Sequence, residues 1–345
     1  MKIIADVMGS DKGAKELVSG AVAALREFEG IELVLVGNEN EIKAALDECG
    51  CDTSSLEIVH TETVIEMCDD PLSVNRAKAD SSMSTALRLL KEGKGDAVVS
   101  AGNTGALFAG ASLIVRKIKG LNRPAIATVL PMTPPVLLLD SGANINVTPE
   151  YLVQFAIIGS EYMKKMYGVE SPRVGLLNNG AEETKGTELQ LATYALLREC
   201  DKVNFVGNVE GNKIPQNACD VLVTDGFTGN ILLKNIEGMG KLMMNTLRGL
   251  FTSNFGTKMA YLLTKKQLSA VKKNFDSSEH GGAPLLGIAK PVIKAHGSSN
   301  AKAFKNAIRQ AAAYARSGMI EELNAKSAEL FPKKKASVKA EGSEE

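Results

Sequence analysis

Two turns in the sequence share one pattern and carry residues that can bind an anion. Residues 96–105 (DAVVSAGNTG) and 220–229 (DVLVTDGFTG) both fit D-x-x-V-S/T-x-G-x-T-G, which predicts a strand, a glycine turn and a helix start. Glycine lets the backbone approach a ligand, and a helix N-terminus presents free N–H groups to an anion. Turn and capping chemistry explains either turn alone, but two matching turns favour ligand contact. The residues expected to contribute are Gly102, Asn103, Thr104, Gly105, Gly226 and Thr228.

A third cluster lies at the start of the last long helical pattern. His296, Gly297, Ser298 and Ser299 directly precede it. Serine is an expected helix N-cap, so capping alone explains the two serines. It does not explain why a histidine and Lys302 gather at the same helix start. This combination is typical of an anion pocket.

Lys185 follows the apolar run RVGLLNNG and precedes a helical pattern. At such a position it can anchor a phosphate as a point charge, or form an exposed ion pair with Glu182 or Glu183 that contributes little. The chain has no G-x-S-x-G nucleophile elbow, no H-E-x-x-H zinc motif, no dinucleotide fingerprint and no P-loop. These absences favour direct attack by a bound nucleophile, for which the protein supplies position and charge.

The elements that must position these residues are short apolar runs alternating with helical periods. The runs include KIIADVMG, IELVLVG, DAVVSAGNTG, VLLLDSGAN, RVGLLNNG and DVLVTDGFTG. Such alternation predicts an α/β fold with a mostly parallel, buried sheet and helices on both faces. Ligands bind at the carboxyl ends of the strands in such sheets, which is where the candidate turns lie.

One segment stands apart by its charge. Between Glu237 and Asp276 lie 38 residues without an acidic side chain but with seven lysines or arginines. Apolar residues recur there at helical spacing, and Gly256 allows a break, so we predict a protruding amphipathic hairpin over about 236–275. Its stripes indicate helix packing or dimerisation, or docking on anionic lipid or an acidic protein. The expected contacts of the tip are Lys258, Met259, Leu262, Leu263, Lys265 and Lys266.

Composition excludes several classes of protein. The 345 residues carry 40 Lys+Arg and 40 Asp+Glu, whereas nucleic-acid binders carry a basic excess. A content of 44% apolar and 23% charged residues suffices for a core, which excludes disorder as the main state. The scattered cysteines, and the lack of a leader or a long apolar run, predict a reduced, cytoplasmic chain without a metal site. Residues 333–345 are predicted to form a disordered, charged tail.

Several segments together resemble one family, the bacterial acyl-acyl-carrier-protein:phosphate acyltransferases of phospholipid synthesis. The resemblance spans the chain up to about residue 325. It rests on many motifs in the same order. The matching segments are residues 4–11, 78–107, 123–131, 142–160, 173–186, 205–211, 220–234, 281–287 and 291–311.

This resemblance implies a fold, a reaction and a set of site residues. The implied fold is that of the isocitrate and isopropylmalate dehydrogenases and the phosphotransacetylases, with one catalytic domain of two intertwined lobes over residues 1–332. The implied reaction transfers a long-chain fatty acyl group from acyl-carrier protein to inorganic phosphate, without cofactor or metal. The family's catalytic lysine and asparagine map onto Lys185 and Asn230. Further phosphate or substrate ligands are expected at Asp6, Gly9, Asp11 and Asn178.

The resemblance also implies partners. A downstream glycerol-3-phosphate acyltransferase would use the acyl-phosphate. The chain would form a homodimer attached peripherally to the inner face of the cell membrane through its hairpin. A rival interpretation is a short-chain phosphotransacylase that uses coenzyme A, which needs no basic apolar hairpin. An isocitrate-type hydroxy-acid dehydrogenase is less favoured, because it needs clustered aspartates for a divalent metal and a nicotinamide site, and neither signature is found.

Overall fold

The structure is a computed structural model that describes residues 1–52, 56–275 and 281–332. The predicted tail over 333–345 lies outside the described residues. The strands are β1 (Lys2–Asp6), β2 (Glu32–Gly37), β3 (Glu57–His60), β4 (Ala97–Ser100), β5 (Ala125–Leu130), β6 (Val136–Leu139), β7 (Arg173–Asn178), β8 (Asn204–Glu210), β9 (Val221–Val223), β10 (Ala283–Leu286) and β11 (Val292–Lys294). Within the described residues they form one sheet in the order β3-β2-β1-β4-β11-β10-β5-β6-β9-β7-β8.

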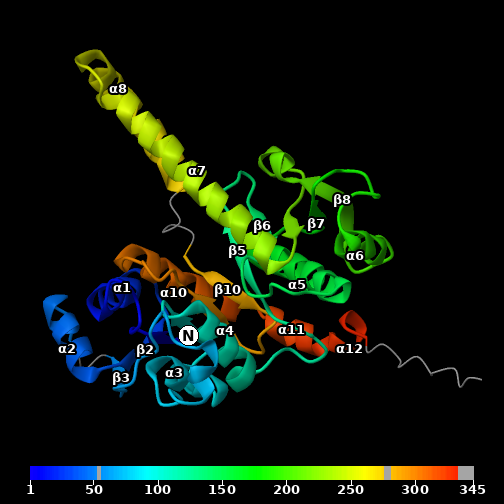
Figure 1. Ribbon diagram of the computed structural model, residues 1–345. Helices are drawn as coiled ribbons and strands as arrows, with labels where there is room; N and C mark the ends of the chain where they lie inside the picture. Colours follow the sequence, from blue (N-terminus) through cyan, green and yellow to red (C-terminus); the bar gives the residue numbers. More distant parts are fainter. Residues whose placement is uncertain (53–55, 276–280, 333–345) are drawn as a thin grey trace, which may run out of the picture.

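Helices connect most of these strands (Figure 1). They are α1 (Ala14–Glu27), α2 (Glu39–Glu48), α3 (Ser82–Lys91), α4 (Thr104–Gly110), α5 (Pro149–Tyr167), α6 (Glu188–Arg198), α7 (Gly226–Thr252), α8 (Phe255–Phe275), α10 (Ala301–Arg316), α11 (Met319–Ala325) and α12 (Ser327–Leu330). Short helical turns are η2 (Pro71–Asn75), η3 (Ala111–Val115) and η4 (Gly211–Gln216).

The sheet changes direction near its middle. β1, β2, β3, β4 and β11 run parallel to one another, and so do β6, β7, β8 and β9. Between the two blocks, β10 pairs antiparallel with both β11 and β5, and β5 pairs antiparallel with β6. The sheet is therefore mostly parallel, as predicted, and is built from two parallel blocks joined through β10 and β5.

Strand β1 shows why helices cover both faces of the sheet. Its continuous apolar sequence directs Ile3 and Ala5 to one face and Ile4 to the other. The first face packs against α1, α5 and α10, and the second packs against α3 and α4. A parallel strand buried on both sides requires this kind of sequence. The predicted α/β fold with helices on both faces is confirmed.

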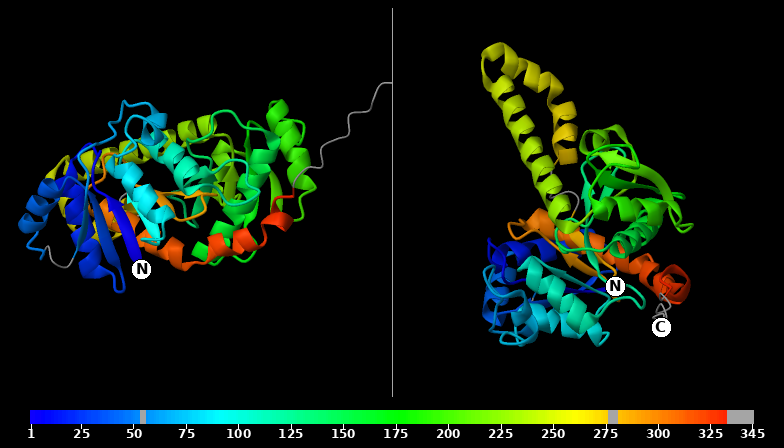
Figure 2. Two further views of the ribbon diagram at one scale, coloured as in Figure 1. Left: turned by 90° about the horizontal axis from the view of Figure 1, so that it is seen from below. Right: turned by 45° about the vertical axis from the view of Figure 1, so that its right-hand side comes forward.

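The predicted hairpin is also confirmed. Helices α7 and α8 pack side by side and project away from the sheet (Figures 1 and 2). The break between the two helices falls at Ser253 and Asn254 rather than at Gly256, because Asn254 caps α8. The side chain of Asn254 accepts a hydrogen bond from Thr257 N at 3.0 Å, and the backbone N–H of Asn254 donates to Thr257 Oγ1 at 3.1 Å. In the part of the chain that the structure describes, no helix is long and apolar enough to cross a membrane.

Candidate active site

A cavity of about 770 Å³ is lined by residues from both parallel blocks of the sheet and by residues 230–241 of α7. Its walls come from loops that follow β1, β4, β6 and β11, from β5, and from α7. The volume falls within the range of about 300–1,000 Å³ that is usual for ligand pockets. The predicted residues that line it are Asp11, Thr104, Asn230, His296, Gly297, Ser298 and Ser299.

The turn after β11, residues 296–299, is held by its own hydrogen bonds. The ring atom His296 Nδ1 accepts the backbone N–H of Ser298 at 3.2 Å and lies 2.9 Å from Ser298 Oγ. Because Nδ1 accepts, a neutral ring carries its proton on Nε2. Partial burial, and the positive charge of Lys234 on α7, lower the pKa of His296 below its ordinary value. The ring is therefore neutral at pH 7 and has an N–H to donate.

The expected serine cap of α10 is wrong. Asn300 is the N-cap, and its side chain accepts the N–H of Ala303 at 2.9 Å. The N–H of Ala301 donates to the Glu16 carboxylate, also at 2.9 Å. These two N–H groups of the helix start already have partners. Anion binding at this place must therefore rest on side chains and on the preceding turn.

The two matching glycine turns differ in geometry. After β4 the N-cap is Asn103, which accepts the N–H of Ala106 at 3.0 Å. After β9 the N-cap is Asp225, which accepts both the N–H and the hydroxyl of Thr228, at 2.8 and 2.7 Å. The shared pattern thus starts its helices at different positions. The hydroxyl of Thr228 is engaged by the cap, whereas Thr104 lines the cavity.

Other predicted residues of the first parallel block do not line the cavity but contact neighbouring loops and strands. The buried carboxylate of Asp6 accepts the hydroxyl of Ser100 at 2.6 Å. Gly9 packs against Gly102, since a Cβ at Gly9 would lie 3.5 Å from the Cα atom of Gly102. The side-chain amide of Asn103 donates to three backbone carbonyls of the loop before η2, those of Glu66, Met67 and Asp69.

The predicted glycines Gly105 and Gly226 lie close to neighbouring residues. A Cβ at Gly105 would lie 2.9 Å from Pro71, and the N–H of Gly226 donates to Asn144 O at 2.7 Å. Bulkier residues would displace these neighbours.

Asn178 and Lys185 lie outside the cavity wall, at the carboxyl end of β7 and in the loop that follows it. Lys185 is exposed, in the loop after β7, and does not belong to the cavity wall. Asn178, at the end of β7, donates to Lys185 O at 3.1 Å. The amide of Asn178 therefore shapes the loop that carries Lys185.

Two functional side chains are additional to those expected from the sequence. Lys294 is the last residue of β11 and is buried in the wall of the cavity. Its Nζ donates to the carbonyls of Ala101 and Ala295. The second is Asp140, which follows β6 and is fully buried. Lys294 ends the strand sequence VIK, and Asp140 directly follows the apolar strand VLLL. A polar residue at a strand's carboxyl end is the signal that could have pointed to both, although it does not show that they are buried.

Asp140 organises the loop next to Asn230. Its carboxylate accepts five N–H groups at 2.6–3.2 Å, from the backbones of Ile126, Gly142, Ala143 and Asn144 and the side chain of Asn144. Gly142 in this loop adopts a positive φ of 144°, and a Cβ there would lie 3.6 Å from the Asn230 side chain. The Asp140 network therefore sets the surface on which Asn230 rests.

We expect Asp140→Ala to lower the free energy of unfolding by about 3 kcal/mol or more, since it leaves several buried N–H groups without a partner. Urea denaturation measures this change. The matched control is Asp201→Ala, which removes an exposed aspartate 3.2 Å from Lys202 and should change the free energy by less than about 1 kcal/mol. Equal effects of the two substitutions would contradict the role given to Asp140.

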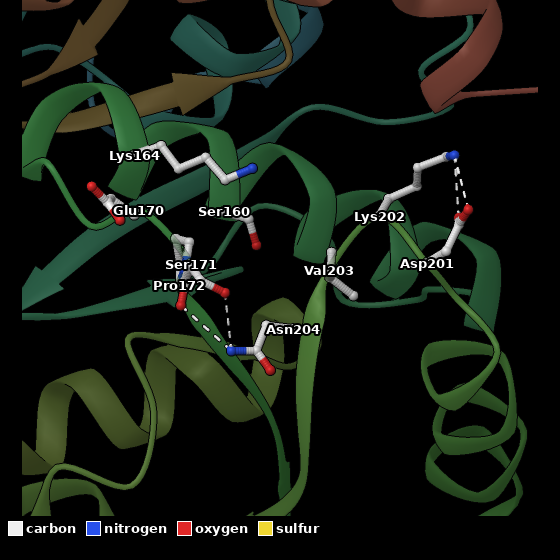
Figure 3. Close-up of a pocket in the computed structure, with 9 residues that line it drawn as sticks. All are labelled: Ser160, Lys164, Glu170, Ser171, Pro172, Asp201, Lys202, Val203 and Asn204. Atoms are coloured by element: carbon white, nitrogen blue, oxygen red, sulfur yellow. Dashed lines mark hydrogen bonds and ion pairs between the residues drawn. The ribbon is translucent and has the colours of Figure 1, made fainter.

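A smaller hollow of about 260 Å³ lies where α5 meets the starts of β7 and β8 (Figure 3). Its cations already have partners, Lys164 with Glu161 at 2.7 Å and Lys202 with Asp201 at 3.2 Å. It lies at the amino ends of the strands, opposite the edge where ligands bind in such sheets. None of the predicted site residues lines it.

Solved structures place this architecture among the phosphotransacylase-like folds. A phosphotransacetylase from Streptococcus pyogenes superposes with a TM-score of 0.59 at 18% identity, covering 93% of this chain and 94% of that one. A protein from Salmonella typhimurium assigned as a 4-hydroxythreonine-4-phosphate dehydrogenase gives 0.54 at 12% identity, covering 91% and 99%. At these identities the likeness concerns the fold, and it confirms the predicted kinship with transacylase and dehydrogenase folds.

The sequence comparisons identify the family. Residues 1–322 match the family described as "Fatty acid synthesis protein". The phosphate acyltransferase of Acetivibrio thermocellus is 44% identical over 324 residues, covering 94% of this chain and 95% of that protein. The phosphate acyltransferase of Thermoanaerobacter pseudethanolicus is 46% identical over 312 residues, covering 90% and 92%. The chain belongs to the phosphate acyltransferase family of enzymes.

Proposed function

We propose that this enzyme transfers a long-chain fatty acyl group from acyl-carrier protein to inorganic phosphate, which gives an acyl-phosphate for phospholipid synthesis. Family membership supports the reaction class. The observation that carries the choice of a long acyl chain is that one cavity joins the polar turn 296–299 to an apolar wall. The apolar residues of that wall include Met67, Ile126, Val129, Pro131, Leu233 and Ile236.

In the proposed reaction, phosphate lies on the turn 296–299 and the thioester carbonyl lies beside Asn230. A phosphate oxygen attacks the carbonyl carbon, so that a C–O bond forms and the C–S bond breaks. The proton of the phosphate ends on the released thiol. The amide of Asn230 donates to the oxygen that becomes negative during the attack. The step balances without a metal, a nucleotide or a covalent enzyme intermediate.

The identity of the acyl donor can be tested by comparing two thioesters. Palmitoyl-carrier protein should be used with a kcat/KM at least about 100-fold above that of acetyl-CoA, because each buried methylene contributes about 0.8 kcal/mol. The reverse preference would make the enzyme a short-chain phosphotransacylase.

A catalytic role for Lys185 stays a prediction, since this residue lies outside the cavity wall. A Lys185→Ala variant with near-normal turnover would remove Lys185 from the mechanism.

The hairpin carries the proposed attachment to the membrane. Its tip exposes 80% of Phe255, 62% of Leu262 and 82% of Leu263 beside Lys258, Lys265 and Lys266. Apolar side chains flanked by cations fit an anionic lipid surface. At that surface the acyl-phosphate would meet a glycerol-3-phosphate acyltransferase.

Leu263→Glu tests this attachment. We expect the variant to lose flotation with phosphatidylglycerol vesicles while it still turns over soluble donor, because a carboxylate opposes insertion at an anionic surface. Leu113→Glu, an equally drastic change at a half-exposed leucine of η3, should float like the wild type. Retained flotation of Leu263→Glu, combined with lost turnover of carrier-protein substrates, would assign the tip to the carrier protein instead.

The proposed homodimer would form through the exposed apolar side chains of α7. This helix exposes more than half of the side chains of Phe227, Ile231, Met239 and Leu242. A second copy of the chain that packs on this helix would cover them. Analytical ultracentrifugation that finds a monomer at micromolar concentration would contradict the dimer.

A further inference from the structure

Lys294 is the buried cation of the cavity wall. Its side chain is 8% exposed, and its Nζ donates to Ala101 O at 3.1 Å and to Ala295 O. These carbonyls satisfy two of the three ammonium N–H groups. Asp6 and Asp11 are near enough to act on the charge electrostatically, but neither forms a direct ion pair with it. Among the described residues, no carboxylate lies within ion-pair distance of this Nζ. A buried charge without a direct ion pair is unfavourable unless a ligand supplies a closer counter-ion.

The other cations of the cavity wall are exposed to solvent. Lys234 lies 2.9 Å from Glu237 and is about half exposed, and Lys241 is exposed on α7. The carboxylates in the wall are Asp11 and Glu237. The cations in the wall are Lys234, Lys241 and Lys294, so the wall carries an excess of positive charge. Of these three cations, Lys294 is the buried one. An anion that enters the cavity meets this charge.

Ser299 provides a second, independent observation. Its side chain is 4% exposed and belongs to the same cavity wall. Its Oγ has no hydrogen-bond partner among the described residues. A buried hydroxyl without a partner costs about 1–3 kcal/mol, and such a group in a native site requires an explanation. An oxygen of a bound anion would accept this hydroxyl.

We propose that Lys294 and Ser299 bind the phosphate nucleophile, so that Lys294 supplies the charge that the sequence assigned to Lys185. The proposal rests on the acyl transfer to phosphate proposed above. As the C–O bond forms and the C–S bond breaks, the negative charge moves from phosphate to the departing sulfur. Lys294 therefore binds the ground state of phosphate, and its loss should act on phosphate affinity more than on binding of the acyl donor.

The test uses the full-length enzyme with inorganic phosphate as the probe. Calorimetric titration without acyl donor measures the Kd of phosphate, and steady-state kinetics measures KM for phosphate and for palmitoyl-carrier protein separately. Lys294→Met and Ser299→Ala should raise the Kd and KM of phosphate at least about tenfold. KM for the acyl donor should change less than about twofold. Lys294→Arg should restore part of the phosphate affinity, since it keeps the charge.

Lys290→Met is the matched control. Lys290 lies four residues earlier and also donates to a backbone carbonyl, Leu90 O at 2.9 Å, but it does not line the cavity. Its loss should leave the phosphate Kd unchanged. A folded Lys294→Met protein with the wild-type phosphate Kd would overturn the proposal. If Lys294→Met does not fold, an unchanged phosphate Kd in Ser299→Ala overturns it in the same way.

Failure of the proposed reaction is distinguishable from failure of this site. Wild-type acyl transfer combined with unchanged phosphate binding in the variants contradicts the site alone. Phosphate binding that is lost in the variants, combined with no acyl transfer by the wild type, contradicts the reaction and supports the site.

Discussion

Asn230→Ala should lower kcat for acyl transfer by about 10²–10³, with a small change in KM for phosphate. Asn230 lies at the start of α7 in the cavity wall, against Gly142 of the loop that Asp140 holds. In the proposed reaction this amide donates to the oxygen that gains negative charge in the transition state. Loss of such a donor costs about 10²–10³ in rate, because the interaction strengthens as charge develops.

Asn235→Ala is the control for this prediction. Asn235 lies on the same helix and is exposed, and it is not part of the cavity wall. Its replacement should leave kcat within about twofold of the wild type. A near-normal kcat for Asn230→Ala would show that the oxygen is stabilised by other groups. A rise in both KM values without loss of kcat would assign Asn230 to ground-state binding.

The affinity for phosphate should fall steeply above about pH 8. Burial lowers the pKa of Lys294 to about 8, so the ammonium is charged below this pH and neutral above it. If the charged form binds phosphate, KM for phosphate should rise by about tenfold per pH unit once the pH exceeds this pKa. A profile of KM from pH 6.5 to 10 measures the effect.

Other groups near Lys294 also titrate or carry charge, so the profile needs a reference. Asp6, Asp11 and His296 interact with it electrostatically, and Lys234 and Glu237 line the same cavity. Lys294→Arg keeps these groups and stays charged over the whole range. The ratio of wild-type to Lys294→Arg values therefore isolates the titration of Lys294. A ratio that does not change with pH would contradict the assignment of the charge to Lys294.

The fold follows from local sequence patterns. Strands such as β1 and β2 are buried on both faces and are therefore continuous apolar runs. The hairpin was predictable because one stretch of chain both lacks acidic residues and carries apolar residues at helical spacing. The start of α10 was placed wrongly because serine and asparagine are nearly equal as N-caps. The extended backbone of Asn300 decides between them, and the sequence does not show it.

The site was harder to predict because its parts come from distant strands. The ending VIK of β11 places a lysine at the carboxyl end of a strand, but it does not show that this lysine is buried. Lys294 is buried because β11 lies between β4 and β10, which places its Nζ against Ala101 O. The Asp140 carboxylate accepts a hydrogen bond from the backbone N–H of Ile126 across the β5–β6 pair. Such contacts depend on the order of strands in the sheet, which the spacing of residues along the chain does not encode.

The central claim is that phosphate attacks a carrier-protein thioester in this cavity. The most direct measurement incubates the purified enzyme with palmitoyl-carrier protein and inorganic phosphate, without added metal or nucleotide, and follows free carrier protein together with hydroxylamine-sensitive acyl-phosphate. We predict that both products form in equal amounts and only when phosphate is present. Release of carrier protein without acyl-phosphate, or no release while acetyl-CoA and phosphate react, would contradict the claim.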